Sequence, residues 1–111
     1  MLKRSHTAVL EKNEVYDGPF ETEPYECAWA GEATWFIRVL DIADGTTLRA
    51  HAQVSPDGLF WCDKGDPPIE MTGAGLQHMP LRDFGGWLRL RVEVEGNRPS
   101  VKVLVYLVLK E

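Results

Sequence analysis

Residues 86–95, GWLRLRVEVE, alternate strictly between apolar and polar side chains, and this alternation decides the fold class. The apolar positions are Leu88, Leu90, Val92 and Val94. The positions between them carry arginine and glutamate, together with Trp87. Because successive side chains of a β-strand point to opposite faces, this period of two predicts a strand with one buried face and one solvated face.

Three further stretches are rich in β-branched and aromatic residues and predict long strands: residues 33–42, 47–54 and 101–110. The last of these, VKVLVYLVLK, is apolar on both parities, so both of its faces need cover. Its second apolar parity consists of Leu104, Tyr106 and Val108. These three side chains either face a second layer of the same domain or form an oligomer interface, and the sequence leaves both interpretations open.

A short fifth strand is predicted over residues 59–63, and weaker candidates complete an all-β pattern: residues 7–12, 24–30 and 75–84. Clusters of Gly, Pro and Asp separate most of the candidates, and no stretch shows a sustained helical period of about 3.6 residues. We therefore predict one domain over residues 1–111, an antiparallel, jelly-roll-like β-sandwich of about eight strands.

Local signals predict one hairpin connection and leave the form of the N-terminal segment open. The turn residues of EGNRPS, residues 95–100, predict that the last two long strands form a central hairpin. Residues 1–20 are the least patterned part of the chain. We expect them to be either an N-terminal arm or a frayed terminus.

The stretch VSPDGLFW, residues 54–61, raises the question of whether its polar residues form a site or a turn. Pro56 has the fixed φ that suits the second position of a turn, and Asp57 is able to accept hydrogen bonds from nearby amides. Gly58 is suited to the left-handed backbone conformation. The stretch is therefore interpreted as a hairpin connection that leaves Trp61 beyond it.

Charge and hydropathy exclude several classes of protein. The chain of 111 residues has a formal net charge of −5, whereas nucleic-acid binding needs a surplus of Lys and Arg. No stretch approaches the roughly 18 apolar residues of a membrane span, and the first residues lack the apolar region of a secretory signal. We expect no nucleic-acid or membrane partner and a cytoplasmic or virion-associated location.

Catalytic and metal-binding patterns are weak. His6, His51 and His78 fall in separate segments without the spacing of metal ligands, so we expect no metal, no cofactor and no enzymatic activity.

Cys27 and Cys62 each lie beside tryptophan, which favours buried thiols. The sequence does not exclude a disulfide between them.

Four tryptophans are many for this length. Trp87 falls on the polar parity of its strand, where an exposed ring is typical of protein or sugar recognition, unless a loop covers it. Trp61 and Trp35 are the other candidate ligand-contacting aromatics. A carbohydrate-binding module is therefore the alternative to a protein-assembly role.

The order of motifs also carries a resemblance. AQVSPDGLFWCD is followed by an aromatic residue with glycine, then by WLRLRVEVEG and PSVKVLVYLVLK. The matching residues are 55–63, 84–94 and 96–110. This series resembles a group of small β-sandwich proteins encoded among phage and prophage structural genes and in some bacterial genomes.

The resemblance implies a non-enzymatic structural protein, such as a virion accessory or capsid-decoration protein. It implies that the chain is a homo-oligomer, with a capsid or other assembly protein as a further partner. The residues expected at its interface are Leu104, Tyr106, Val108 and Trp87.

Overall fold

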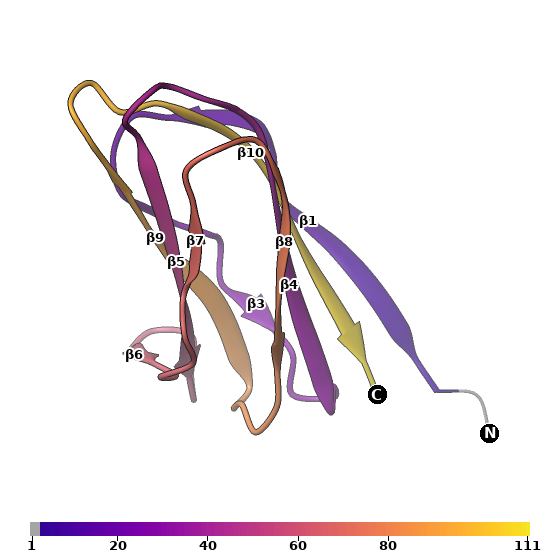
Figure 1. The fold of residues 1–111 in the computed structure, drawn as a ribbon. Helices are drawn as coiled ribbons and strands as arrows, with labels where there is room; N and C mark the ends of the chain where they lie inside the picture. The colour runs from indigo at the N-terminus through magenta and orange to yellow at the C-terminus, as the bar shows by residue number, and fades with distance from the viewer. Residues whose placement is uncertain (1–2) are drawn as a thin grey trace.

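The computed structural model describes residues 3–111, which form strands and loops without a helix (Figure 1). Ten strands make two antiparallel sheets that pack face to face, which confirms the predicted antiparallel β-sandwich. Sheet A has the order β1-β10-β4-β8. Its strands are β1 (Ser5–Tyr16), β4 (Glu32–Ile42), β8 (Gly75–Leu81) and β10 (Val101–Lys110).

Sheet B is built on two long central strands, β5 (Thr47–Ser55) and β9 (Trp87–Glu95). Short strands border this pair: β2 (Phe20–Glu21) and β3 (Tyr25–Glu26) beside β9, and β6 (Cys62–Asp63) and β7 (Ile69–Met71) beside β5. The strand expected over residues 59–63 is thus confined to its last two residues. Figure 1 shows β6 on the side of sheet B, away from β1 and β8.

The core lies between the sheets and takes one parity from each long strand. The inward residues of β9 and β10 are all at most 4% exposed: Leu88, Leu90, Val92, Val94, Val101, Val103, Val105, Leu107 and Leu109. Since a fully buried Val or Leu contributes about 1.5–3 kcal/mol, these alternating rows hold the two sheets together. The alternation in residues 86–95 therefore predicted the inner face of β9 correctly.

The expected hairpin between the last two long strands is wrong. β9 pairs with β5 in sheet B, whereas β10 lies between β1 and β4 in sheet A. The connection crosses from one sheet to the other at Gly96, whose φ is +144°. A Cβ at this position would lie 2.6 Å from the carbonyl oxygen of Gly45, so the crossing depends on glycine.

The expectation of an N-terminal arm or frayed terminus is also wrong for the described part of residues 1–20. β1 pairs with β10 along its whole length, from Ser5 opposite Lys110 to Tyr16 opposite Val101. Met1 and Leu2 lie outside the described residues. The first long strand is thus an edge of sheet A and part of the sandwich.

Both edges of sheet A are irregular. The register of β1 shifts twice, between Val9 and Glu11 and between Lys12 and Glu14. β8, at the opposite edge, contains Pro80, which has no N–H to donate. Bulges and proline are features by which edge strands resist pairing with another sheet.

Candidate interaction surfaces

The outer side of sheet A carries a continuous set of mostly apolar residues. Residues directly opposite in neighbouring strands share a face, so the register places them in three rows across all four strands. The rows are Thr7–Val108–Thr34–Pro80, Val9–Tyr106–Phe36–His78 and Lys12–Leu104–Arg38–Leu76. We call these twelve residues the apolar face.

Aromatic side chains occupy the middle of the apolar face. Tyr106 lies opposite Phe36, whose ring stacks on His78 with centroids 5.9 Å apart. At the two edges Val9 is 53% exposed and Leu76 is 60% exposed. The largest apolar patch of a protein surface is often its interaction site, so this face is a candidate for one.

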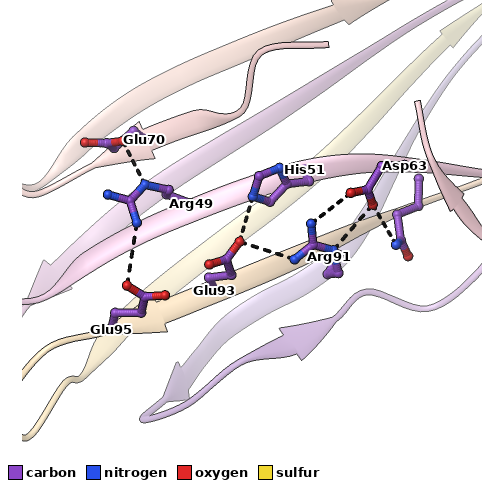
Figure 2. A network of polar contacts seen from close by, with 8 residues as sticks. Arg49, His51, Asp63, Glu70, Arg91, Glu93 and Glu95 are labelled. Carbon is purple, nitrogen blue, oxygen red and sulfur yellow. Dashed lines mark hydrogen bonds and ion pairs between the residues drawn. The ribbon is translucent and has the colours of Figure 1, made fainter. Parts of the chain in front are cut away.

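The outer side of sheet B is charged instead, and its side chains bond to one another (Figure 2). The Arg49 guanidinium lies 2.9 Å from Glu70 and 3.6 Å from Glu95. A second group centres on Arg91, which lies 3.2 Å from Glu93 and 3.0 Å from Asp63. These pairs join β5, β6, β7 and β9 across the sheet.

His51 and Gln53 extend this network along β5. The Nε2 atom of His51 lies 2.8 Å from Oε1 of Glu93, and the amide of Gln53 donates to Asp63. The hydrogen bond with His51 lowers the pKa of Glu93. The hydrogen bond from Arg91 lowers the pKa of Asp63, and the hydrogen bond from Gln53 lowers it by a smaller amount. Both carboxylates are therefore held in the charged form as parts of a structural network.

The connection at residues 55–61 is a turn, as the sequence predicted. The Ser55 hydroxyl oxygen accepts the N–H groups of Asp57 and Gly58, at 3.2 and 2.8 Å. Oδ1 of Asp57 accepts the N–H groups of Leu59 and Phe60, at 2.8 and 3.1 Å. Gly58 has a φ of +79°, in the left-handed region. The polar side chains of this stretch thus fix its backbone.

The three tryptophans of the sequence prediction lie in different surroundings. Trp35 has no exposed surface, because it points from β4 into the core, so the expectation that it contacts a ligand is wrong. The guanidinium of Arg89 lies 4.4 Å from the centre of the Trp61 ring. Trp87 is half-buried on the outer side of sheet B, beneath the backbone of Gly58.

The structure divides the expected interface residues between two surfaces. Leu104, Tyr106 and Val108 lie together on the apolar face and are half-buried. Trp87 belongs to sheet B and lies opposite Ser55, so it does not join them. Sequence reasoning missed the contribution of Phe36, although its parity within residues 33–42 is a usable signal.

Leu59 and Phe60 were also missed as surface residues. Each is 77% exposed, because the strand that was expected to include them begins only at Cys62. We call these two residues the apolar tip. The signal for them was the position of two large apolar residues directly after the turn at Gly58.

The two cysteines are free thiols in different environments. Cys27 is fully buried, and this burial raises its pKa to about 12. Cys62 is exposed, so the expectation of a buried thiol there is wrong. It fails because β6 is a two-residue strand at the border of sheet B.

Within residues 3–111, no group of three or more His, Cys, Asp or Glu side chains has the arrangement to hold a metal ion. The same residues contain no helix with the length and hydropathy to cross a membrane. The geometry that stands out is therefore the contrast between the apolar face and the charged outer side of sheet B.

The sequence matches no protein-family model and no curated protein. Solved structures share its fold. The PBSX exported protein XepA has a TM-score of 0.59 and 12% identity over 97% of this chain and 36% of XepA. A chain in the structure of infectious bursal disease virus Gt strain has a TM-score of 0.62 and 10% identity, over 97% of this chain and 32% of the viral one.

The SPBc2 prophage-derived protein YomS is similar over its full extent, with a TM-score of 0.56 and 11% identity over 100% of this chain and 96% of YomS. The chain thus spans about a third of the length of the two longer proteins and nearly all of YomS. At such identities the likeness shows the fold alone. The predicted resemblance to phage-associated β proteins is confirmed at that level.

Proposed function

We propose that this protein is a non-enzymatic structural protein that assembles with copies of itself through the apolar face, as a virion accessory or capsid-decoration protein does. The observation that carries the proposal is the cluster of Tyr106, Phe36 and Leu104 on an outer surface of the sandwich. The opposite outer surface is covered by ion pairs. A sandwich with one charged and one apolar outer side is suited to docking on one side and solvation on the other.

The area of the apolar face limits the affinity with which two copies of the protein associate. Four strands about 4.8 Å apart and three rows about 7 Å apart cover about 400 Å² in projection. A stable protein interface buries about 800 Å² on each partner. The apolar face therefore supplies the centre of an interface, and we expect association in the micromolar range unless flanking residues also take part.

The similarity in fold to XepA and YomS supports a phage-associated setting for this role. The charged residues of sheet B also fit a structural role, because Asp63 and Glu93 bond to neighbouring side chains within the same sheet. No specific observation favours the carbohydrate-binding alternative. Trp35 is buried, and Arg89 lies over the Trp61 ring.

Sedimentation velocity over about 5–500 μM protein tests the proposal. We expect the wild type to self-associate with increasing concentration. Tyr106→Glu places a charge at the centre of the apolar face and should weaken association by about tenfold or more. Asn97→Glu adds the same charge on an exposed loop and serves as the control. A wild type that stays monomeric over the whole range contradicts the proposal.

A further inference from the structure

The apolar tip is the most exposed apolar feature of the described chain. Five large apolar side chains in residues 3–111 are more than half exposed: Val9, Val15, Leu59, Phe60 and Leu76. Leu59 and Phe60 are the most exposed of them, at 77% each, and they are adjacent in the sequence. Two neighbouring apolar side chains in this position cost solvation free energy unless a partner covers them.

The other three residues of this set all lie on the outer side of sheet A. Val9 lies opposite Tyr106, and Leu76 lies opposite Arg38, so both belong to the apolar face. Val15 lies opposite Lys102, which is on the same side of β10 as Leu104. The exposed large apolar residues of the described chain are thus confined to two places, the apolar tip and the outer side of sheet A.

The apolar tip is held on a fixed backbone. Asp57 accepts hydrogen bonds from the N–H groups of both tip residues, and the Ser55 hydroxyl bonds to Asp57 in turn. Gly58 packs on the ring of Trp87. Because the loop is already ordered, docking of the tip costs little additional conformational entropy.

The apolar tip and the apolar face lie on opposite sides of the molecule. The loop that bears the tip folds over the outer side of sheet B, where Gly58 contacts Trp87 and Trp61 lies against Arg89. The apolar face is the outer side of sheet A. A tip therefore has no access to the apolar face of its own molecule, but it can reach that of another copy.

The charges of the two surfaces are complementary. The twelve residues of the apolar face include Lys12 and Arg38 and no carboxylate. Neither cation has an ion-pair partner within residues 3–111. Beside the tip, Asp57 is exposed and has no ion-pair partner within residues 3–111, whereas Asp63 is already paired with Arg91.

From these observations we infer that the apolar tip of one copy docks on the apolar face of the next. This inference rests on the proposed self-assembly and names its geometry. A contact between two different surfaces on opposite sides of a molecule is heterologous, so repetition of the contact produces a ring or a chain and not a two-fold dimer. The partner is a second copy of this chain.

Two variants, mixed in equal amounts, test the inference. The double variant Leu59→Ser/Phe60→Ser lacks the tip and keeps the face, whereas Tyr106→Glu lacks the face and keeps the tip. Each variant alone should self-associate at least about tenfold more weakly, and should sediment as a monomer at low micromolar concentrations where the wild type associates. The mixture should form a complex of one copy of each variant that does not grow further, because only one intact tip and one intact face can meet.

The outcomes separate this inference from the proposed function. A monomeric wild type overturns the proposed function and the inference with it. If the tip variant self-associates over the same concentrations as the wild type, the inference alone is overturned. The tip would then bind a different partner, such as another protein or a lipid surface. Monomeric variants whose mixture forms no complex also overturn it. Far-ultraviolet circular dichroism of each variant checks that it is folded.

Cross-linking gives a second measurement, in which a covalent bond reports which two surfaces meet. In a Cys62→Ser background, copies with Phe60→Cys and copies with Leu76→Cys are mixed under mild oxidation. The inference expects disulfide dimers that contain one copy of each variant. Dimers formed only between two Leu76→Cys copies would show a face-to-face contact and overturn the inference.

Discussion

The backbone of Gly58 lies directly against the indole ring of Trp87, so close that a Cβ at residue 58 would be 3.1 Å from Cδ2 of the ring. Gly58 also has a φ of +79°, which L side chains rarely adopt. This contact fastens the loop that carries the apolar tip to the outer side of sheet B. It also covers the one tryptophan that the sequence had placed on a polar strand face.

The contact predicts a difference between two alanine substitutions. Gly45 has a φ of +80°, and a Cβ at this residue would meet no atom within 4 Å, so Gly45→Ala should cost about 1 kcal/mol from backbone strain alone. Gly58→Ala adds the steric contact with Trp87 and should cost about 1 kcal/mol more. Urea unfolding of both variants measures the difference. Equal free energies of unfolding would contradict the proposed contact.

The two sides of β10 should respond differently to truncation. Leu107 is fully buried, so Leu107→Ala should lower the free energy of unfolding by about 2–5 kcal/mol. Leu104 lies on the outer side, and Leu104→Ala should cost about 1 kcal/mol or less at low protein concentration. Denaturant unfolding at low micromolar protein compares them. A larger loss for Leu104→Ala would place the core on the wrong side of sheet A.

Acid should weaken the network on sheet B. The hydrogen bond from Arg91 lowers the pKa of Asp63 in the folded protein, so the unfolded chain binds a proton more readily. The contribution of Asp63 to stability is therefore present above its unfolded pKa of about 3.9 and is lost as the pH falls further, through the lower folded value. The contribution is about 1 kcal/mol or less, because the pair is partly exposed.

Asp63→Asn tests this dependence. The wild type should be more stable than the variant at pH 6, and the difference should shrink as the pH falls below about 4. Arg91→Gln removes the guanidinium charge beside Asp63 and should likewise make the free energy of unfolding less dependent on acid pH. A difference between wild type and Asp63→Asn that stays constant from neutral to acid pH would argue against the network.

The two thiols should differ in reactivity. Cys62 is exposed, whereas Cys27 is buried and its pKa is raised to about 12 by that burial. Since the thiolate is the reactive form, one thiol of the folded protein should react with a maleimide, and the second only after unfolding. Mass spectrometry of labelled protein counts the modified residues. Cys62→Ser should abolish labelling of the folded protein, and modification of Cys27 under native conditions would contradict the structure.

The strands with regular alternation were predictable from the sequence, and the connections between sheets were not. β9 alternates without interruption, so its buried face followed from the period of two. The turn residues before β10 signal a reversal of the chain but do not say which sheet the next strand joins. The close approach of Gly96 to the Gly45 carbonyl arises from contacts distant in sequence.

β1 was predicted only in part, as a weak strand candidate over residues 7–12, for a different physical reason. Its two register shifts change which residues face inward, so burial along the strand does not keep a period of two. Ala8 is buried, Val9 is exposed, and Leu10 and Glu11 are both half-buried.

The candidate surface was predictable in part. Both-parity apolarity in residues 101–110 indicated a second apolar face, covered either by another layer or by a second copy, but only the cross-strand register shows that Phe36 and His78 belong to it.

The irregular edges of sheet A affect how the protein behaves at high local concentration, where strand edges of neighbouring copies meet. Proteins that accumulate in ordered arrays bring strand edges repeatedly into proximity, and exposed edges then template continuous cross-β growth. Here the double bulge of β1 and Pro80 in β8 interrupt that ladder at both borders of the sheet. Copies of this protein can therefore be crowded together and still meet through side chains, so each sandwich keeps its own backbone hydrogen bonds.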